Sequence, residues 1–144
     1  MQRGFIVVLL SVAGAGCGGS SSLPTRIPVS IAGEWTGTVT FQSGQAEQGT
    51  YSAWSSSSEG SIAEGVGIAT GQFTMPGTAP ATFSGTVAGT TFEGTMTVTD
   101  SQGCTFSSRL AGTVSERALV WAMPPPPGND CGWSVRTTLQ MSRR

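Results

Sequence analysis

Three cysteines are the residues of this sequence whose positions suggest chemistry most directly. Cys17 follows a short apolar segment, and Cys104 and Cys131 lie in the second half of the chain. If the chain is exported, it enters an oxidising compartment, where two of three cysteines can pair and one is left over. We therefore predict a disulfide between Cys104 and Cys131 and a separate role for Cys17. Two cysteines without histidine are not expected to hold a metal ion.

Other reactive groups are scarce. The chain has no histidine, and its seven cationic residues are all arginine. Imidazole bases, lysine Schiff bases and phosphate-loop lysines are therefore excluded. Glu34 and Glu93 take the outward parity of their expected strands and lack a pocket for acid-base work. We predict no catalytic residue, no cofactor and no enzymatic activity, and the net charge of −1 gives no basic face for nucleic acid.

The first sixteen residues have the composition of a signal peptide. Residues 1–3 include one arginine, and residues 5–12 are almost continuously apolar. Even as a helix, residues 4–16 would cover only about 20 Å of a hydrocarbon core about 30 Å thick. The segment therefore predicts export and not a membrane span.

The four residues Gly-Ala-Gly-Cys that end at Cys17 resemble the lipobox of bacterial lipoproteins, with Gly14 where that family usually carries Leu, Val or Ile. The resemblance implies cleavage before Cys17 and attachment of lipid to its sulfur. Gly18, where inner-membrane lipoproteins tend to carry Asp, implies the outer membrane, on its periplasmic or cell-surface side. Two alternatives stay open: cleavage after residues 13–15, which form an A-x-A site, and a structural role for Cys17.

Residues 17–30 have the composition of a tether between this anchor and a folded domain. Gly18 to Ser22 is flexible in composition, and the proline-spaced residues 23–28 are stiffer. We expect one domain over residues 31–144, a usual domain length.

The domain alternates apolar and polar residues with the period of a β-strand. In residues 33–41, for example, Trp35, Val39 and Phe41 share one face. Turn residues rich in Gly, Ser, Asp and Pro separate the segments, which predicts antiparallel hairpins. We expect an all-β fold, an antiparallel up-and-down meander of about eight strands that closes into a small barrel and so removes exposed edges. An open or two-layered sheet is the alternative. The expected strands cover residues 34–41, 47–54, 66–74, 80–88, 91–99, 104–114, 118–123 and 132–142, with a bulge near Gly71.

The tripeptide Gly33-Glu34-Trp35 at the start of the first strand resembles the Gly-x-Trp motif of calycins, the group of lipocalins, avidins and fatty-acid-binding proteins. In lipocalins a basic residue from the end of the last strand packs over this tryptophan, and Arg143 has the matching position. The alternative is that Arg143 and Arg144 are solvated. The Thr-Asp-Tyr turn of lipocalins is missing from the sequence.

A strand count places Cys104 and Cys131 at the same end of the barrel, where their disulfide would fasten residues 124–130 over the mouth. The four prolines at 124–127 could serve as a polyproline ligand, but a stiff loop is the simpler interpretation. Apolar side chains at strand spacing could line a ligand pocket at this mouth: Trp121, Trp133, Phe106, Met96, Tyr51 and Trp54.

Eight strands make a barrel that side chains can fill or that holds one small ligand. We therefore predict an outer-membrane-anchored lipoprotein that could bind a small, apolar ligand. The alternative is a structural or protein-interaction lipoprotein of the cell envelope with a filled barrel. That alternative requires exposed apolar residues on the outer faces, for which Trp54 is the best candidate.

Overall fold

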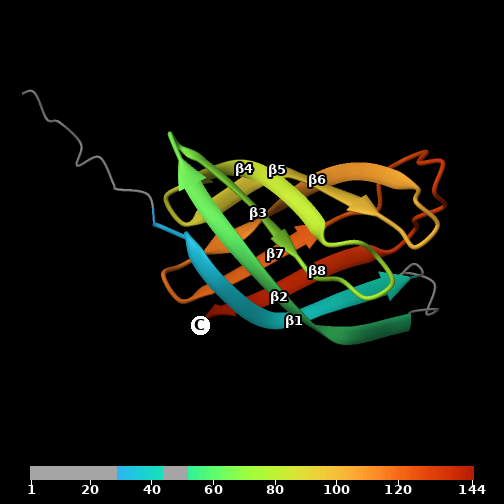
Figure 1. Cartoon of the computed structure of the whole chain (residues 1–144), viewed down its shortest axis with the longest axis horizontal. Helices are drawn as coiled ribbons and strands as arrows, with labels where there is room; N and C mark the ends of the chain where they lie inside the picture. Colours follow the sequence, from blue (N-terminus) through green and yellow to red (C-terminus); the bar gives the residue numbers. More distant parts are fainter. Residues whose placement is uncertain (1–28, 44–51) are drawn as a thin grey trace, which may run out of the picture.

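The computed structural model describes residues 29–43 and 52–144 and contains eight antiparallel strands. Each strand pairs with the next along the chain, and β1 also pairs with β8, so the sheet closes into a barrel (Figure 1). The predicted all-β closed meander is confirmed. The strands are β1 (Gly33–Ser43), β2 (Ser52–Gly65), β3 (Ile68–Phe73), β4 (Ala81–Ala88), β5 (Thr91–Thr99), β6 (Thr105–Val114), β7 (Ala118–Met123) and β8 (Arg136–Arg143).

The barrel has two distinct ends. The start of β1, the β2–β3 turn and the end of β8 lie at the end that we call the tether end (Figure 1). Val29 lies beside the β2–β3 turn at this end. The β5–β6 turn and the β7–β8 loop lie at the opposite end, which we call the distal end. Over the described part of the chain, no helix has the length and the apolar composition needed to cross a membrane.

Inward-facing side chains alternate with outward-facing ones along each strand, as a pleated sheet requires. Glycine takes some inward positions because the neighbouring strand approaches too closely for a side chain. A Cβ atom on Gly37 would lie 2.0 Å from the Gln140 carbonyl oxygen, and one on Gly112 would lie 2.0 Å from the Val120 carbonyl oxygen. These contacts let the sheet curve tightly enough to close with eight strands.

The second strand differs most from its prediction. We expected residues 47–54, whereas β2 continues to Gly65 and pairs with β1 along most of its length. Its inward positions include Ser56, Ser58 and Gly60, which have no apolar side chain to reveal the alternation. The buried Ser58 hydroxyl instead donates a 2.8 Å hydrogen bond to the Thr74 carbonyl oxygen. The residues of β2 therefore form a strand because they pair with the more apolar strands β1 and β3, although their own composition does not indicate a strand.

The predicted bulge near Gly71 is wrong. β3 pairs with β2 and β4 in an uninterrupted register. The bulge was predicted because Val66 and Ile68 have the opposite parity from Phe73. In the structure Val66 lies in the β2–β3 turn and Ile68 faces outward, so Phe73 can face inward without a bulge. The last strand also begins later than predicted, at Arg136, because residues 132–135 belong to the loop before it.

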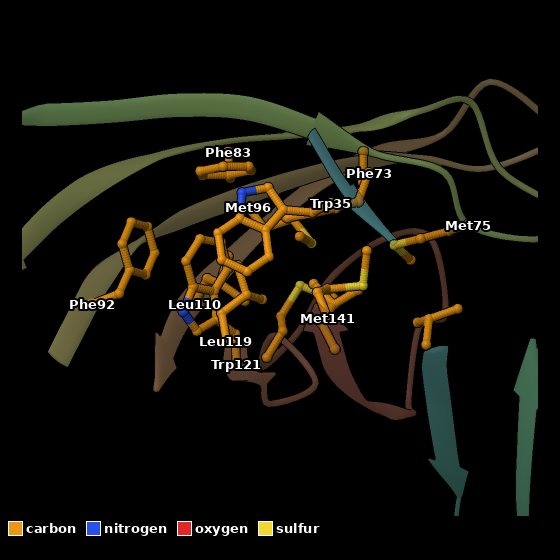
Figure 2. Packing of buried hydrophobic residues seen from close by; sticks show 14 of the residues in the cluster. Trp35, Phe73, Met75, Phe83, Phe92, Met96, Leu110, Leu119, Trp121 and Met141 are labelled. Carbon is orange, nitrogen blue, oxygen red and sulfur yellow. The ribbon is translucent and has the colours of Figure 1, made fainter. Parts of the chain in front are cut away.

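The core runs through the barrel from end to end. Among the described residues, twenty-one hydrophobic residues are buried, none more than 6% exposed. Figure 2 shows how the rings and aliphatic chains of fourteen of them fill the space between the strands. They include Trp35, Val39 and Phe41, which the alternation of the first strand placed on one face, and also Phe83, Phe92, Leu110, Leu119, Leu139 and Met141. Such packing leaves the two ends and the outer wall as the surfaces available for function.

Candidate functional site

The tether end is closed by the segment that leads into β1. Ile31 is fully buried, and its carbonyl oxygen accepts a 2.9 Å hydrogen bond from Nε1 of Trp35. The guanidinium of Arg143 lies 5.0 Å from the Trp35 ring centroid, within cation–π distance. The packing of Arg143 over Trp35 that the resemblance to lipocalins implied is therefore present, and the solvated alternative is wrong for Arg143, whereas Arg144 is exposed.

Arg143 is also the hub of the hydrogen bonds at this end. Its Nε donates to the Glu116 carbonyl oxygen at 2.7 Å, and Nη1 donates to the Ala32 carbonyl oxygen at 2.6 Å. Nη2 donates to the Ser30 carbonyl oxygen at 2.7 Å. One side chain thus joins the β6–β7 turn to the segment before β1.

Glu64, near the end of β2, holds the same segment from the other side. Its two carboxylate oxygens accept hydrogen bonds from the Ser30 hydroxyl and from the Ile31 backbone N–H, each at 2.8 Å. Sequence reasoning missed this residue, because a lone glutamate in a serine-rich segment gives no sign of its partners. Their bonding fixes residues 30 and 31 against the barrel.

An apolar cavity of about 240 Å³ opens beside this closure. Val29, Ala69 and Val87 line it together with the β2–β3 turn and part of Glu64. The cavity lies at the tether end, whereas the sequence predicted a ligand pocket at the other mouth.

Trp121 and Met96, two of the predicted ligand-lining residues, lie in the packed centre of the barrel (Figure 2). Both are fully buried. The Trp121 ring stacks on Phe92 at a centroid distance of 4.1 Å and meets Phe83 edge-on at 5.1 Å. Aromatic neighbours thus occupy the space where a ligand would have to sit.

Phe106 and Trp133, also predicted to line a pocket, lie together at the distal end with centroids 5.0 Å apart. Trp133 is 5.9 Å from Phe41, and Phe41 stacks on Trp54 at 5.5 Å. We call these four residues the distal aromatic cluster. Tyr51, another of the predicted lining residues, falls outside the described residues.

Trp54 is not on the outer wall, where the interaction hypothesis placed it. It pairs with Phe41 and has the inward parity of β2, but it lies so near the distal end that 48% of it is exposed. One side of its ring packs on Phe41 while much of the residue meets solvent. Trp54 therefore lies at the exposed rim of the distal end, although it has the parity of inward-facing residues.

We call the exposed edge of the distal end, formed by Trp54, Trp133 and the β7–β8 loop, the distal rim. The predicted disulfide holds this rim. Cys104 and Cys131 are bonded, with their Cα atoms 5.6 Å apart. The bridge ties the β7–β8 loop to the start of β6. Ser108 adds a 2.8 Å hydrogen bond from its hydroxyl to the Pro124 carbonyl oxygen. The prolines therefore lie in a loop that is fastened at both ends.

Asn129 positions Trp133 within that loop. Its Oδ1 accepts a 2.8 Å hydrogen bond from the Trp133 backbone N–H, and its Nδ2 donates to the Trp133 carbonyl oxygen at 2.8 Å. Nδ2 also donates to the Pro126 carbonyl oxygen at 2.9 Å. Asparagine commonly organises turns in this way, which is the signal that could have found it.

Asp100 lies close to both cysteines, but its carboxylate already has partners. Oδ1 accepts hydrogen bonds from the backbone N–H groups of Gln102 at 2.8 Å and Cys104 at 2.9 Å. Both sulfurs are in the disulfide. The Asp100 carboxylate therefore organises the β5–β6 turn, and the two sulfurs of the disulfide are not free thiolates that could bind a metal ion.

Within the described residues, three buried polar side-chain atoms have no hydrogen-bond partner: Trp121 Nε1, Trp133 Nε1 and Thr137 Oγ1. Trp121 lies in the core, whereas the other two lie toward the distal end. Thr137 is 1% exposed and pairs with Phe41 of the distal aromatic cluster. An unpartnered buried hydroxyl is uncommon because leaving it so costs about 1–3 kcal/mol.

The carboxylates expected to face outward do so. Glu34 and Glu93 are exposed, and Glu93 forms an ion pair with Arg109 on the barrel wall. Glu59 forms a second exposed ion pair with Arg144. These carboxylates are therefore on the surface, without a shared pocket.

Comparison of the chain with protein-family models, with curated proteins and with solved structures finds no match.

Proposed function

We propose that this protein is an exported lipoprotein, anchored to the bacterial outer membrane through Cys17, whose barrel binds another protein of the cell envelope through its distal rim. The anchor is supported by the apolar leader and by the lipobox-like residues before Cys17. The position of Val29 at one end of the barrel also supports it, because an anchor there leaves the opposite end pointing away from the bilayer.

The half-exposed ring of Trp54, stacked on Phe41 at 5.5 Å, carries the proposed binding role. Tryptophan is enriched among the residues that dominate binding energy in protein interfaces. A rim fastened by a disulfide and by Asn129 loses little conformational freedom on binding. The filled interior favours contact with the rim over entry of a ligand into the barrel.

A small apolar ligand at the same rim is a second candidate. The observation in its favour is that Thr137 Oγ1 and Trp133 Nε1 are buried without partners beside aromatic rings. A ligand that combines an apolar body with a hydroxyl or carbonyl group could form a hydrogen bond with one of these atoms. Such a ligand would have to displace part of the rim packing to reach them.

Binding is favoured over catalysis. The exposed carboxylates Glu59 and Glu93 each have an arginine partner on the surface. Because the chain has no histidine and no lysine, a nucleophilic serine or threonine would need a carboxylate or a water-mediated base. The Arg143 contact with Trp35 supports the proposed likeness of the barrel to calycins, a group that includes small-ligand binders such as the avidins.

Two experiments test the proposal. Labelled palmitate should enter the protein expressed in a Gram-negative host, and Cys17→Ser should abolish the label, whereas label retained in that variant contradicts the anchor. A photo-crosslinking phenylalanine derivative at position 54 should give a discrete protein adduct in the intact envelope. The same group at Val120, which is 44% exposed on the barrel wall, serves as the matched control.

Equal crosslinking at positions 54 and 120 would contradict a binding role for the rim. A thermal-shift screen of apolar ligands separates the second candidate. A ligand whose free concentration is 100 times its dissociation constant should add about 2.7 kcal/mol to the free energy of unfolding of the protein. A stabilising ligand whose effect is lost with Thr137→Val would favour the small molecule over the protein partner.

A further inference from the structure

The β2–β3 turn at the tether end carries the most exposed large apolar side chain among the described residues. Val66 is 105% exposed, and Ile68, two residues later, is 48% exposed. Neither packs its full side chain into the barrel. The two residues form an apolar tip on the β2–β3 hairpin, at the same end of the barrel as the β4–β5 and β6–β7 turns (Figure 1).

The conformation of the β2–β3 turn does not explain why residue 66 is valine. Val66 has a φ of 48° and Gly67 has a φ of 78°. Positive φ at both central residues is the requirement of a type I′ turn, where asparagine followed by glycine is preferred. A β-branched residue is rarely found in this conformation, because the Cβ substituents of an L-residue crowd its own backbone there. Val66 therefore costs the fold stability while its side chain gains no burial.

The tip adjoins the apolar cavity at the same end. Val66 and Ile68 line the cavity on one side, and Val29, Ala69 and Val87 line the others. Glu64 is the acidic residue of this lining, and both of its carboxylate oxygens are already bonded to Ser30 and Ile31. The tip and the cavity thus make one surface that is mostly apolar.

The position of this surface indicates its partner. Val29 lines the cavity, and it follows Cys17 by only twelve positions in the chain. A chain of that length spans at most about 40 Å even when fully extended. An acyl anchor on Cys17 would therefore keep Val29, beside the tip and the cavity, within about 40 Å of the bilayer surface, whereas the distal rim is at the far end of the barrel.

We propose that the β2–β3 tip contacts the membrane in which the protein is anchored. Val66 and Ile68 enter the boundary between headgroups and acyl chains, and the cavity beside them faces the lipid. Apolar side chains at that depth gain the burial that they lack in the free protein. The inference rests on the proposed lipid anchor at Cys17 and adds an orientation to it: the barrel stands with its tether end down and its distal rim exposed.

The test uses the full acylated protein reconstituted in vesicles of phosphatidylethanolamine and phosphatidylglycerol. A fluorophore on Thr90→Cys, in the neighbouring turn of the tether end, reports closeness to lipid without altering the tip. A matched fluorophore on Ala79→Cys, an exposed residue of the distal β3–β4 loop, is the control. Lipids with a nitroxide near the headgroup should quench the first fluorophore more than the second.

The double variant Val66→Asn with Ile68→Thr should lose that extra quenching and fall to the level of the control position. Because asparagine suits the turn, the variant should unfold no more readily than the parent protein, so misfolding does not account for the loss. Equal quenching at both positions, or quenching unchanged by the double variant, would overturn the membrane contact. Absence of acyl label on Cys17 would instead overturn the anchor, and with it this inference.

Discussion

Arg143 and Trp35, which are far apart in the chain, meet at the tether end with the guanidinium carbon 5.0 Å from the ring centroid. The contact joins the end of β8 to the start of β1, the two strands whose pairing closes the barrel. The same guanidinium donates to three backbone carbonyl oxygens. A single residue therefore fastens the closing pair of strands and the segment that plugs the end.

Replacing Arg143 with alanine should lower the free energy of unfolding by about 2 kcal/mol, because the cation–π contact and the charged donors of three hydrogen bonds are lost together. Urea denaturation followed by tryptophan fluorescence measures the change. Arg144→Ala is the matched control, since its ion pair with Glu59 is exposed and should contribute at most about 1 kcal/mol. Equal losses in the two variants would contradict a central role for Arg143.

Replacing Cys104 and Cys131 together with alanine should cost about 3–4 kcal/mol, since the bridge closes a loop with a sequence separation of 27. The distal end should loosen more than the tether end, which hydrogen exchange of the β7–β8 loop would show. Mass analysis without reduction should find the two cysteines joined in the parent protein. A double variant as stable as the parent would mean that Asn129 and the packing of Trp133 hold the loop alone.

Gly112→Ala should prevent folding or destabilise the barrel severely, because the new Cβ would lie 2.0 Å from the Val120 carbonyl oxygen and the two strands would have to separate. Gly65→Ala is the control, since nothing lies within 4 Å of the Cβ that it adds. Circular dichroism and thermal melting compare the two. A Gly112→Ala variant that melts with the parent protein would show that the strands can move apart without loss of closure.

Thr137→Val should raise the free energy of unfolding by about 1 kcal/mol, because it keeps the shape of the side chain and removes a buried hydroxyl without a partner. Chemical denaturation of the purified protein measures the effect. Destabilisation by this substitution would indicate that a water molecule or a ligand satisfies Thr137 in solution, in line with the small-ligand candidate.

Val66→Asn alone should stabilise the β2–β3 turn by about 1 kcal/mol, since asparagine tolerates the positive φ of 48° better than valine. The melting temperature of the protein in the absence of membranes measures it. Ile68→Thr, which leaves the turn backbone unchanged, should have little effect. A fall in the melting temperature with Val66→Asn would show that valine contributes to the folded barrel itself.

The sequence alone determined the fold class and the inward faces of most strands. The alternation of Trp35, Val39 and Phe41 is a local pattern with period two, and it survives in any antiparallel partner arrangement. The disulfide was also predictable, because counting strands places Cys104 and Cys131 at one end of any meander. The resemblance to lipocalins suggested the contact between Arg143 and Trp35, but residue types alone could not exclude a solvated Arg143.

Only the tertiary structure decided which strands lack an apolar signature and where the surfaces lie. The serines of β2 became strand residues because two apolar neighbours offered hydrogen-bonding edges, which no local pattern encodes. Trp54 shares the parity of buried residues, yet its height along the barrel leaves it half-exposed at the rim. Whether the interior is filled depends on how side chains from all eight strands add up in volume, and that sum exists only once the strands are in register.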